Sequence, residues 1–102
     1  MKECCRAYLG EQFGGDADVV AEIYGEYVSS IGEKIGEVDA ALAAYNWPRI
    51  DKIAHTVKGN ALAAGDSERA ETASSLRKAA ALEDAALAAP LVDKIKELAK
   101  SL

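Results

Sequence analysis

The longest regular pattern in the chain is a run of apolar residues between Asp16 and Tyr45 that recur every three or four positions. This run comprises Val20, Ile23, Tyr24, Tyr27, Ile31, Ile35, Val38 and Leu42. Such spacing places the apolar side chains along one side of an α-helix, whereas a half-buried strand would alternate. At about 1.5 Å per residue the helix would be about 40 Å long. A stripe of that length has to be buried against other helices.

Capping residues and glycines delimit the neighbouring segments. A short helix is expected over about residues 2–12, before a Gly-Gly pair, and Asp16 can cap the long helix that follows. Asn46 is a good cap and Pro48 is tolerated in a first turn, so a third helix is predicted from there. It should end at Gly65, which can adopt the left-handed conformation.

Two further helices are predicted in the C-terminal third. Asp66 is a credible cap for a fourth helix, which would turn small residues inward at Ala70, Ala73, Leu76 and Ala80. Residues 83–89 fit either a frayed helix end or a loop, and Pro90 is expected in the first turn of a fifth helix. With 21 alanines among 102 residues, the chain predicts one all-α domain over residues 1–102. We expect an antiparallel up-and-down four-helix bundle with a short additional N-terminal helix as a lid.

Charge and cysteine content exclude several classes of function. The net charge of −5 leaves no basic field for nucleic acid or for an anionic membrane surface. The apolar stretches are too short to span a bilayer, so we expect a soluble, cytoplasmic protein. Cys4 and Cys5 are adjacent, which suits neither a metal or redox motif nor a relaxed disulfide, and we expect ordinary reduced thiols.

His55 is the only histidine in the chain, and it lies within the predicted third helix. Counting about 100° per residue, the core face of that helix comprises Ile50, Ile53, Ala54, Val57 and Ala61. His55 falls about 140° from this face, and Lys52 and Lys58 lie about 60° to either side of it. The imidazole should therefore point outward between two ammonium groups. The simplest alternative is a surface histidine without a task, flanked by a solvated pair of lysines.

Gly59 follows His55 by four residues and would lie beside its ring. A glycine inside a helix costs about 1 kcal/mol relative to alanine, so its presence suggests that the ring has to be approachable. An exposed neutral imidazole can act as a nucleophile. Lys52 and Lys58 could then neutralise a phosphoryl group on the ring.

The pattern His55-x-x-Lys58-Gly59, followed by Gly65, resembles the signature of the histidine-containing phosphotransfer (HPt) domain of phosphorelays. The segment Phe13-Gly14-Gly15-Asp16, Trp47 ahead of the histidine helix and the order of helices also resemble that family. The likeness covers nearly the whole chain.

This resemblance implies a phosphocarrier without kinase activity of its own. His55 would attack the phosphoaspartate of a response-regulator receiver domain through Nε2 and later pass the phosphoryl group to another receiver. Lys58 would help to neutralise phosphohistidine, and Gly59 would leave room for the partner. Lys52 is added from geometry alone, while Asn60 stands where the family often has serine and is assigned no role.

The same resemblance implies no cofactor and no metal on this chain, with Mg²⁺ expected on the partner receiver. The partners would be receiver domains and a hybrid histidine kinase, and we expect a monomer. Which kinase and regulators are cognate, and in which direction phosphoryl groups flow, stays open. Met1 and the complete set of helices favour a free-standing protein over a piece of a larger one.

A candidate docking surface lies on the long helix, where Gly25, Gly32 and Gly36 align with Ser29 opposite the apolar stripe. Small residues let a partner helix approach closely. A tolerated surface weakness or a bend explains the same glycines.

Two other functions compete with phosphotransfer. A non-catalytic helical module would bind a receiver or kinase without accepting phosphate. The dimerisation region of a sensor kinase normally has an acidic residue and an Arg-Thr-Pro run after its histidine, whereas Thr56-Val57-Lys58 follows His55 here.

Overall fold

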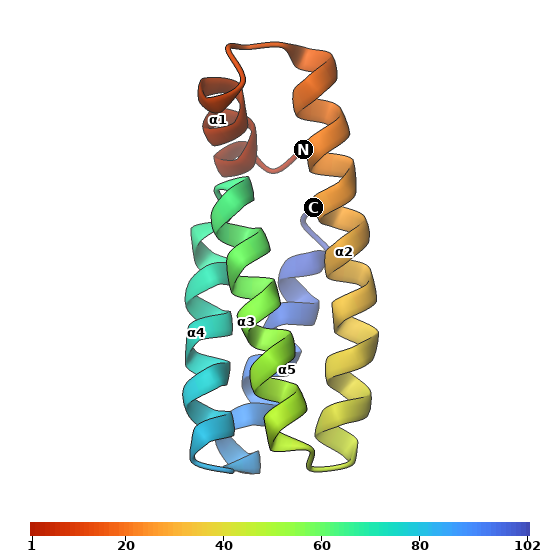
Figure 1. Ribbon diagram of the computed structural model, residues 1–102, viewed down its shortest axis with the longest axis vertical. Helices are drawn as coiled ribbons and strands as arrows, with labels where there is room; N and C mark the ends of the chain where they lie inside the picture. The colour runs from red at the N-terminus through yellow and green to blue at the C-terminus, as the bar shows by residue number, and fades with distance from the viewer.

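The computed structural model describes all 102 residues and contains helices but no strand. The five helices are α1 (Glu3–Gln12), α2 (Ala17–Ala43), α3 (Trp47–Ala64), α4 (Ser67–Ala81) and α5 (Ala85–Ala99). Helices α2 to α5 lie along the long axis of a molecule that measures 43 × 19 × 19 Å (Figure 1). Helix α1 lies at one end, where it contacts α2 and α3. The predicted all-α bundle with a short additional N-terminal helix is confirmed.

The core runs between the helices as a single cluster of 22 buried residues. From α2 it takes the predicted stripe, with Val20, Tyr24, Tyr27, Ile31 and Val38 buried. From α4 it takes mostly alanines, whose small side chains let α3 and α4 lie close together along their length. None of the helices is long and apolar enough to be a candidate for crossing a membrane.

Two of the predicted caps form as expected. The Asp16 carboxylate accepts hydrogen bonds from the backbone N–H groups of Asp18 and Val19, at 3.1 and 3.3 Å. The Asn46 side chain accepts from the N–H of Arg49 at 3.3 Å. Each bond satisfies a donor that the first turn of a helix leaves free. These caps set the starting points of α2 and α3.

The prediction that Pro90 opens the last helix is wrong. Helix α5 begins five residues earlier at Ala85, because the Asp84 carboxylate accepts a hydrogen bond from Leu87 N–H at 3.1 Å. Pro90 lies inside the helix on its exposed side. The alanines around it favour the helix, and burial of Ala88 in the core helps to offset the hydrogen bond that proline cannot make.

Asp66 stands at the predicted N-cap position of α4, but its side chain makes no capping bond. The buried carboxylate turns inward instead and accepts hydrogen bonds from Lys2 Nζ at 2.9 Å, Tyr27 OH at 2.7 Å and Arg69 Nη1 at 3.0 Å. Burial alone would raise the pKa of Asp66, but the hydrogen bonds from Lys2 and Tyr27 outweigh it and leave the pKa below its ordinary value. This buried cluster joins α2 and α4 to Lys2, the residue immediately before α1.

The end of α3 is fixed by Gly65, which has the predicted left-handed conformation with φ 76°. A methyl group at this position would overlap the Tyr8 side chain of α1.

Both cysteines are free, with Cys4 exposed and Cys5 buried. Burial is the main reason that the pKa of Cys5 rises to about 12.

Candidate functional site

His55 lies near the middle of α3 with its side chain exposed to solvent. The opposite face of the helix is in the core, where all five predicted core residues are buried: Ile50, Ile53, Ala54, Val57 and Ala61. Burial of that face fixes the rotation of α3 about its axis. The imidazole is therefore directed outward by a rigid element rather than by a loop.

The two lysines predicted beside His55 lie on different sides of α3. Lys58 is half-buried on the side facing α4, and Lys52 is exposed on the side facing α2, near Lys34 and Glu37. Lys34 pairs with Glu37 at 2.9 Å, but neither Lys52 nor Lys58 forms an ion pair. Both ammonium groups are thus available to an anion that approaches the ring.

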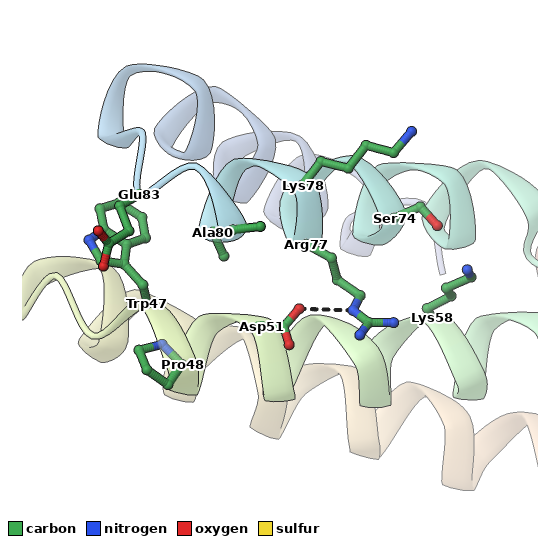
Figure 2. Close-up of a pocket in the computed structure, with 10 residues that line it drawn as sticks. Trp47, Pro48, Asp51, Lys58, Ser74, Arg77, Lys78, Ala80 and Glu83 are labelled. Carbon is green, nitrogen blue, oxygen red and sulfur yellow. Dashed lines mark hydrogen bonds and ion pairs between the residues drawn. The ribbon is translucent and has the colours of Figure 1, made fainter.

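Arg77 on α4 is a third cation at the site, and sequence reasoning missed it. Its Nη1 lies 3.1 Å from His55 Nδ1, and its Nε donates to Asp51 Oδ1 at 2.9 Å. Figure 2 shows Arg77 reaching from α4 across to Asp51, with Lys58 further along α3. Only the register between α3 and α4 brings Arg77 to the ring, and a single sequence carries no signal for that register.

A groove of about 640 Å³ runs between α3 and α4 beside these residues (Figure 2). Trp47 and Glu83 lie at one end of this α3–α4 groove, and Lys58, Arg77 and Lys78 line it further along. The groove is lined by these three cations and by two carboxylates, those of Asp51 and Glu83, so its net charge is positive in a chain whose net charge is −5. This local charge favours anionic ligands at His55.

Gly59 leaves open space next to the ring. A methyl group there would meet no other atom within 4 Å, so no contact inside the molecule requires a glycine. Leu62, on the same face of α3 and two turns beyond His55, is 53% exposed. A partner can therefore approach the imidazole along an uncovered stretch of helix.

Asn60 lies at the contact between α3 and α2, whereas the α2 glycines lie on the exposed surface of α2. The Asn60 amide donates to Ser30 Oγ at 2.8 Å and so joins α3 to α2, away from the imidazole. Gly25, Gly32 and Gly36 are exposed, and a methyl group at any of them would meet nothing within 4 Å. Asn60 is therefore a packing residue, while the glycine face of α2 lies open.

No group of three or more histidine, cysteine or acidic residues could hold a metal ion. The polar groups around His55 are instead mainly donors: two lysines and an arginine, with the Asp51 carboxylate occupied by Arg77. Such a set suits an anion better than a cation.

Fold and site together define a small helical bundle that presents one imidazole, with cations around it, to solvent. The family model of the Hpt domain matches residues 22–102, which include His55, Lys58 and Gly59. The chain therefore belongs to the histidine-containing phosphotransfer domain family, as the sequence resemblance predicted. Searches of curated proteins and of solved structures gave no significant match. Domains of this family are phosphocarriers in phosphorelays rather than kinases.

Proposed function

We propose that this protein accepts a phosphoryl group on His55 from the phosphoaspartate of a receiver domain and passes it to a second receiver. The observation that carries the proposal is the exposed imidazole on a rigid helix, with unpaired Lys52 and Lys58 on either side of it. The open space at Gly59 supports it, because nothing inside the molecule explains the glycine.

In the forward step the lone pair of His55 Nε2 attacks the phosphorus atom of the acyl phosphate. A nitrogen–phosphorus bond forms and the oxygen–phosphorus bond to the aspartate breaks, and that bond's electron pair leaves with the carboxylate. The second transfer reverses this step, with the carboxylate of another receiver as the nucleophile. Positioning and charge neutralisation are the main contributions that a protein makes to such a transfer.

Each charged neighbour then has a distinct task. The phosphoryl group carries nearly two negative charges, and Lys58 would donate a charge-assisted hydrogen bond to it. Lys52 would add a second positive charge from the α2 side. Mg²⁺ would be held by the receiver, where the phosphoaspartate lies, and this chain would need no cofactor of its own.

The partners in this proposal are response-regulator receiver domains and the hybrid histidine kinase that feeds them. The protein would act as a monomer in the cytoplasm. The exposed cations around His55 would speed the encounter with an anionic partner surface, and added salt would slow it.

Transfer of label tests the proposal directly. A receiver carrying a radioactive phosphoryl group is incubated with the parent protein, with His55→Gln and with Lys58→Ala. We expect label on the parent, none on His55→Gln, and transfer to Lys58→Ala slowed roughly tenfold or more, since a charge-assisted hydrogen bond contributes about 1.5–3 kcal/mol.

Lys94→Ala is the control, because Lys94 is an exposed, unpaired lysine on α5 and its removal changes the net charge equally. It should accept label at the parental rate. Equal labelling of the parent and His55→Gln would overturn the proposal. Receiver binding without any label on the parent would identify a non-catalytic module instead.

A further inference from the structure

The contact between Arg77 Nη1 and His55 Nδ1 bears on which ring nitrogen carries the proton when the imidazole is neutral. A guanidinium group stays protonated and can only donate hydrogen bonds. The 3.1 Å contact from Arg77 Nη1 is therefore a hydrogen bond only if His55 Nδ1 has a free lone pair. In a neutral imidazole the proton then lies on Nε2.

Asp51 holds Arg77 in this position. The Arg77 Nε donates to Asp51 Oδ1 at 2.9 Å, while Nη1 of the same guanidinium faces the ring. Asp51 precedes His55 by one turn of α3, so the carboxylate and the ring lie on one face of the helix. Figure 2 shows the guanidinium spanning the space between α4 and α3. The three side chains thus form one cluster in the order Asp51, Arg77, His55.

This arrangement opposes the chemistry proposed above. Attack through Nε2 needs a lone pair on that nitrogen, so the proton must be on Nδ1. As the nitrogen–phosphorus bond forms, the ring also becomes positively charged and keeps its Nδ1 proton. A guanidinium at Nδ1 disfavours both the Nδ1–H tautomer and the positive charge on the ring.

We infer that Arg77 holds unphosphorylated His55 in the Nε2–H tautomer, and that phosphoryl acceptance requires Arg77 to leave Nδ1. The inference rests on the proposed function only for its consequence in phosphotransfer. Arg77 is in this sense a positioning residue, because it acts through the ring. Its withdrawal would leave Asp51 one turn from His55, where the carboxylate can accept the Nδ1–H bond and stabilise the charged ring.

The phosphoryl group of the phosphorylated receiver would draw Arg77 away from the ring. A phosphoryl group with nearly two negative charges competes for a guanidinium more strongly than a neutral ring nitrogen does. At 37% exposure the Arg77 side chain is free enough to change its position. The nucleophile would then be released only when a phosphorylated partner is present.

Nitrogen-15 NMR of the unphosphorylated protein measures the two neutral tautomers of His55 directly, at a pH where the ring is fully deprotonated. We expect the Nε2–H form to predominate in the parent. Arg77→Met removes the donor and keeps an unbranched apolar stem, and it should move the tautomer ratio roughly three- to tenfold toward Nδ1–H, the range expected for one hydrogen bond.

Lys78→Met is the matched control, since Lys78 lines the same groove without contacting the ring. It should leave the ratio unchanged. Asp51→Asn weakens the anchor of Arg77 and should shift the ratio in the same direction as Arg77→Met, so the test survives if one variant fails to fold. A parent ring in the Nδ1–H form, or an unchanged ratio in folded Arg77→Met, would overturn the inference.

The two proposals fail separately in these experiments. The tautomer is measured without phosphate, so a wrong tautomer leaves the labelling of His55 untouched. A parent protein that shows the Nε2–H ring and an Arg77-dependent ratio, yet never takes label, contradicts the phosphocarrier function alone.

Discussion

The molecule contains two aspartate–arginine pairs in different surroundings. Asp66 and Arg69 are completely buried, 3.0 Å apart, where α4 begins. Asp51 and Arg77 are 2.9 Å apart beside His55, with side chains 46% and 37% exposed. The buried pair, Asp66 with Arg69, holds helices together. The exposed pair, Asp51 with Arg77, is free to rearrange.

Burial accounts for the difference. Tyr27 OH donates to Asp66 and accepts from Arg69 Nη1 at 3.1 Å, and the Arg69 guanidinium lies 5.9 Å from the centre of the Tyr27 ring. Two other nitrogens of Arg69 are buried without a partner. Removing Asp66 would strand a buried positive charge, whereas the groups beside His55 can exchange partners with water at little cost.

The largest expected effect separates these two pairs. Asp66→Ala should lower the free energy of unfolding by about 3–5 kcal/mol, the usual cost of breaking a buried charge pair. Asp51→Ala should lower it by about 1 kcal/mol or less, as for an exposed pair. Urea denaturation of both variants measures the difference, and equal losses would show that burial does not distinguish the pairs.

Gly59 inside α3 and Gly65 just after its last residue show a similar contrast in stability. Gly65→Ala should destabilise the protein by about 2 kcal/mol or more, because alanine is strained at φ 76° and its methyl group would overlap Tyr8. Gly59→Ala should instead stabilise it by up to about 1 kcal/mol, since alanine is the better helix former and the space is open.

Gly59→Ala should nevertheless slow phosphotransfer, because the added methyl group would occupy open space one turn from His55, on the face that the receiver has to approach. Thermal unfolding and label transfer on the same preparation measure the two effects. A more stable variant that transfers at the parental rate would mean that Gly59 has no part in partner access.

The smallest expected effect is the pH dependence of the buried cluster. The pKa of Asp66 is lower in the folded protein than the ordinary value of 3.8, so the unfolded chain takes up the proton first as the pH falls. The stability that Asp66 contributes is therefore complete above about pH 5 and is lost as the pH falls through the folded pKa.

Urea denaturation between pH 3 and pH 7 should show this loss in the parent and a flatter profile in Asp66→Asn. An Asp66→Asn profile as steep as that of the parent would assign the acid sensitivity to other carboxylates.

Features that depend on residues close together in the sequence, such as helix faces and caps, could be predicted. Helix spacing gave the orientation of His55 and the two lysines beside it, and the caps at Asp16 and Asn46 were found from residue type alone. Asp66 turned out differently, because one of its partners, Lys2, lies 64 residues away and draws the carboxylate inward. Arg77 was missed for a related reason, since only the packing of α4 on α3 brings it to the ring.

We propose that phosphotransfer takes place at the exposed cluster of Asp51, Arg77 and His55, through Nε2 of His55. Phosphorus-31 NMR after incubation with a phosphorylated receiver tests it most directly. We expect one signal from a phosphorus–nitrogen bond, assigned to Nε2 of His55 and absent in His55→Gln. A phosphoryl group on Nδ1 or on any other residue, or no signal at all, would contradict it.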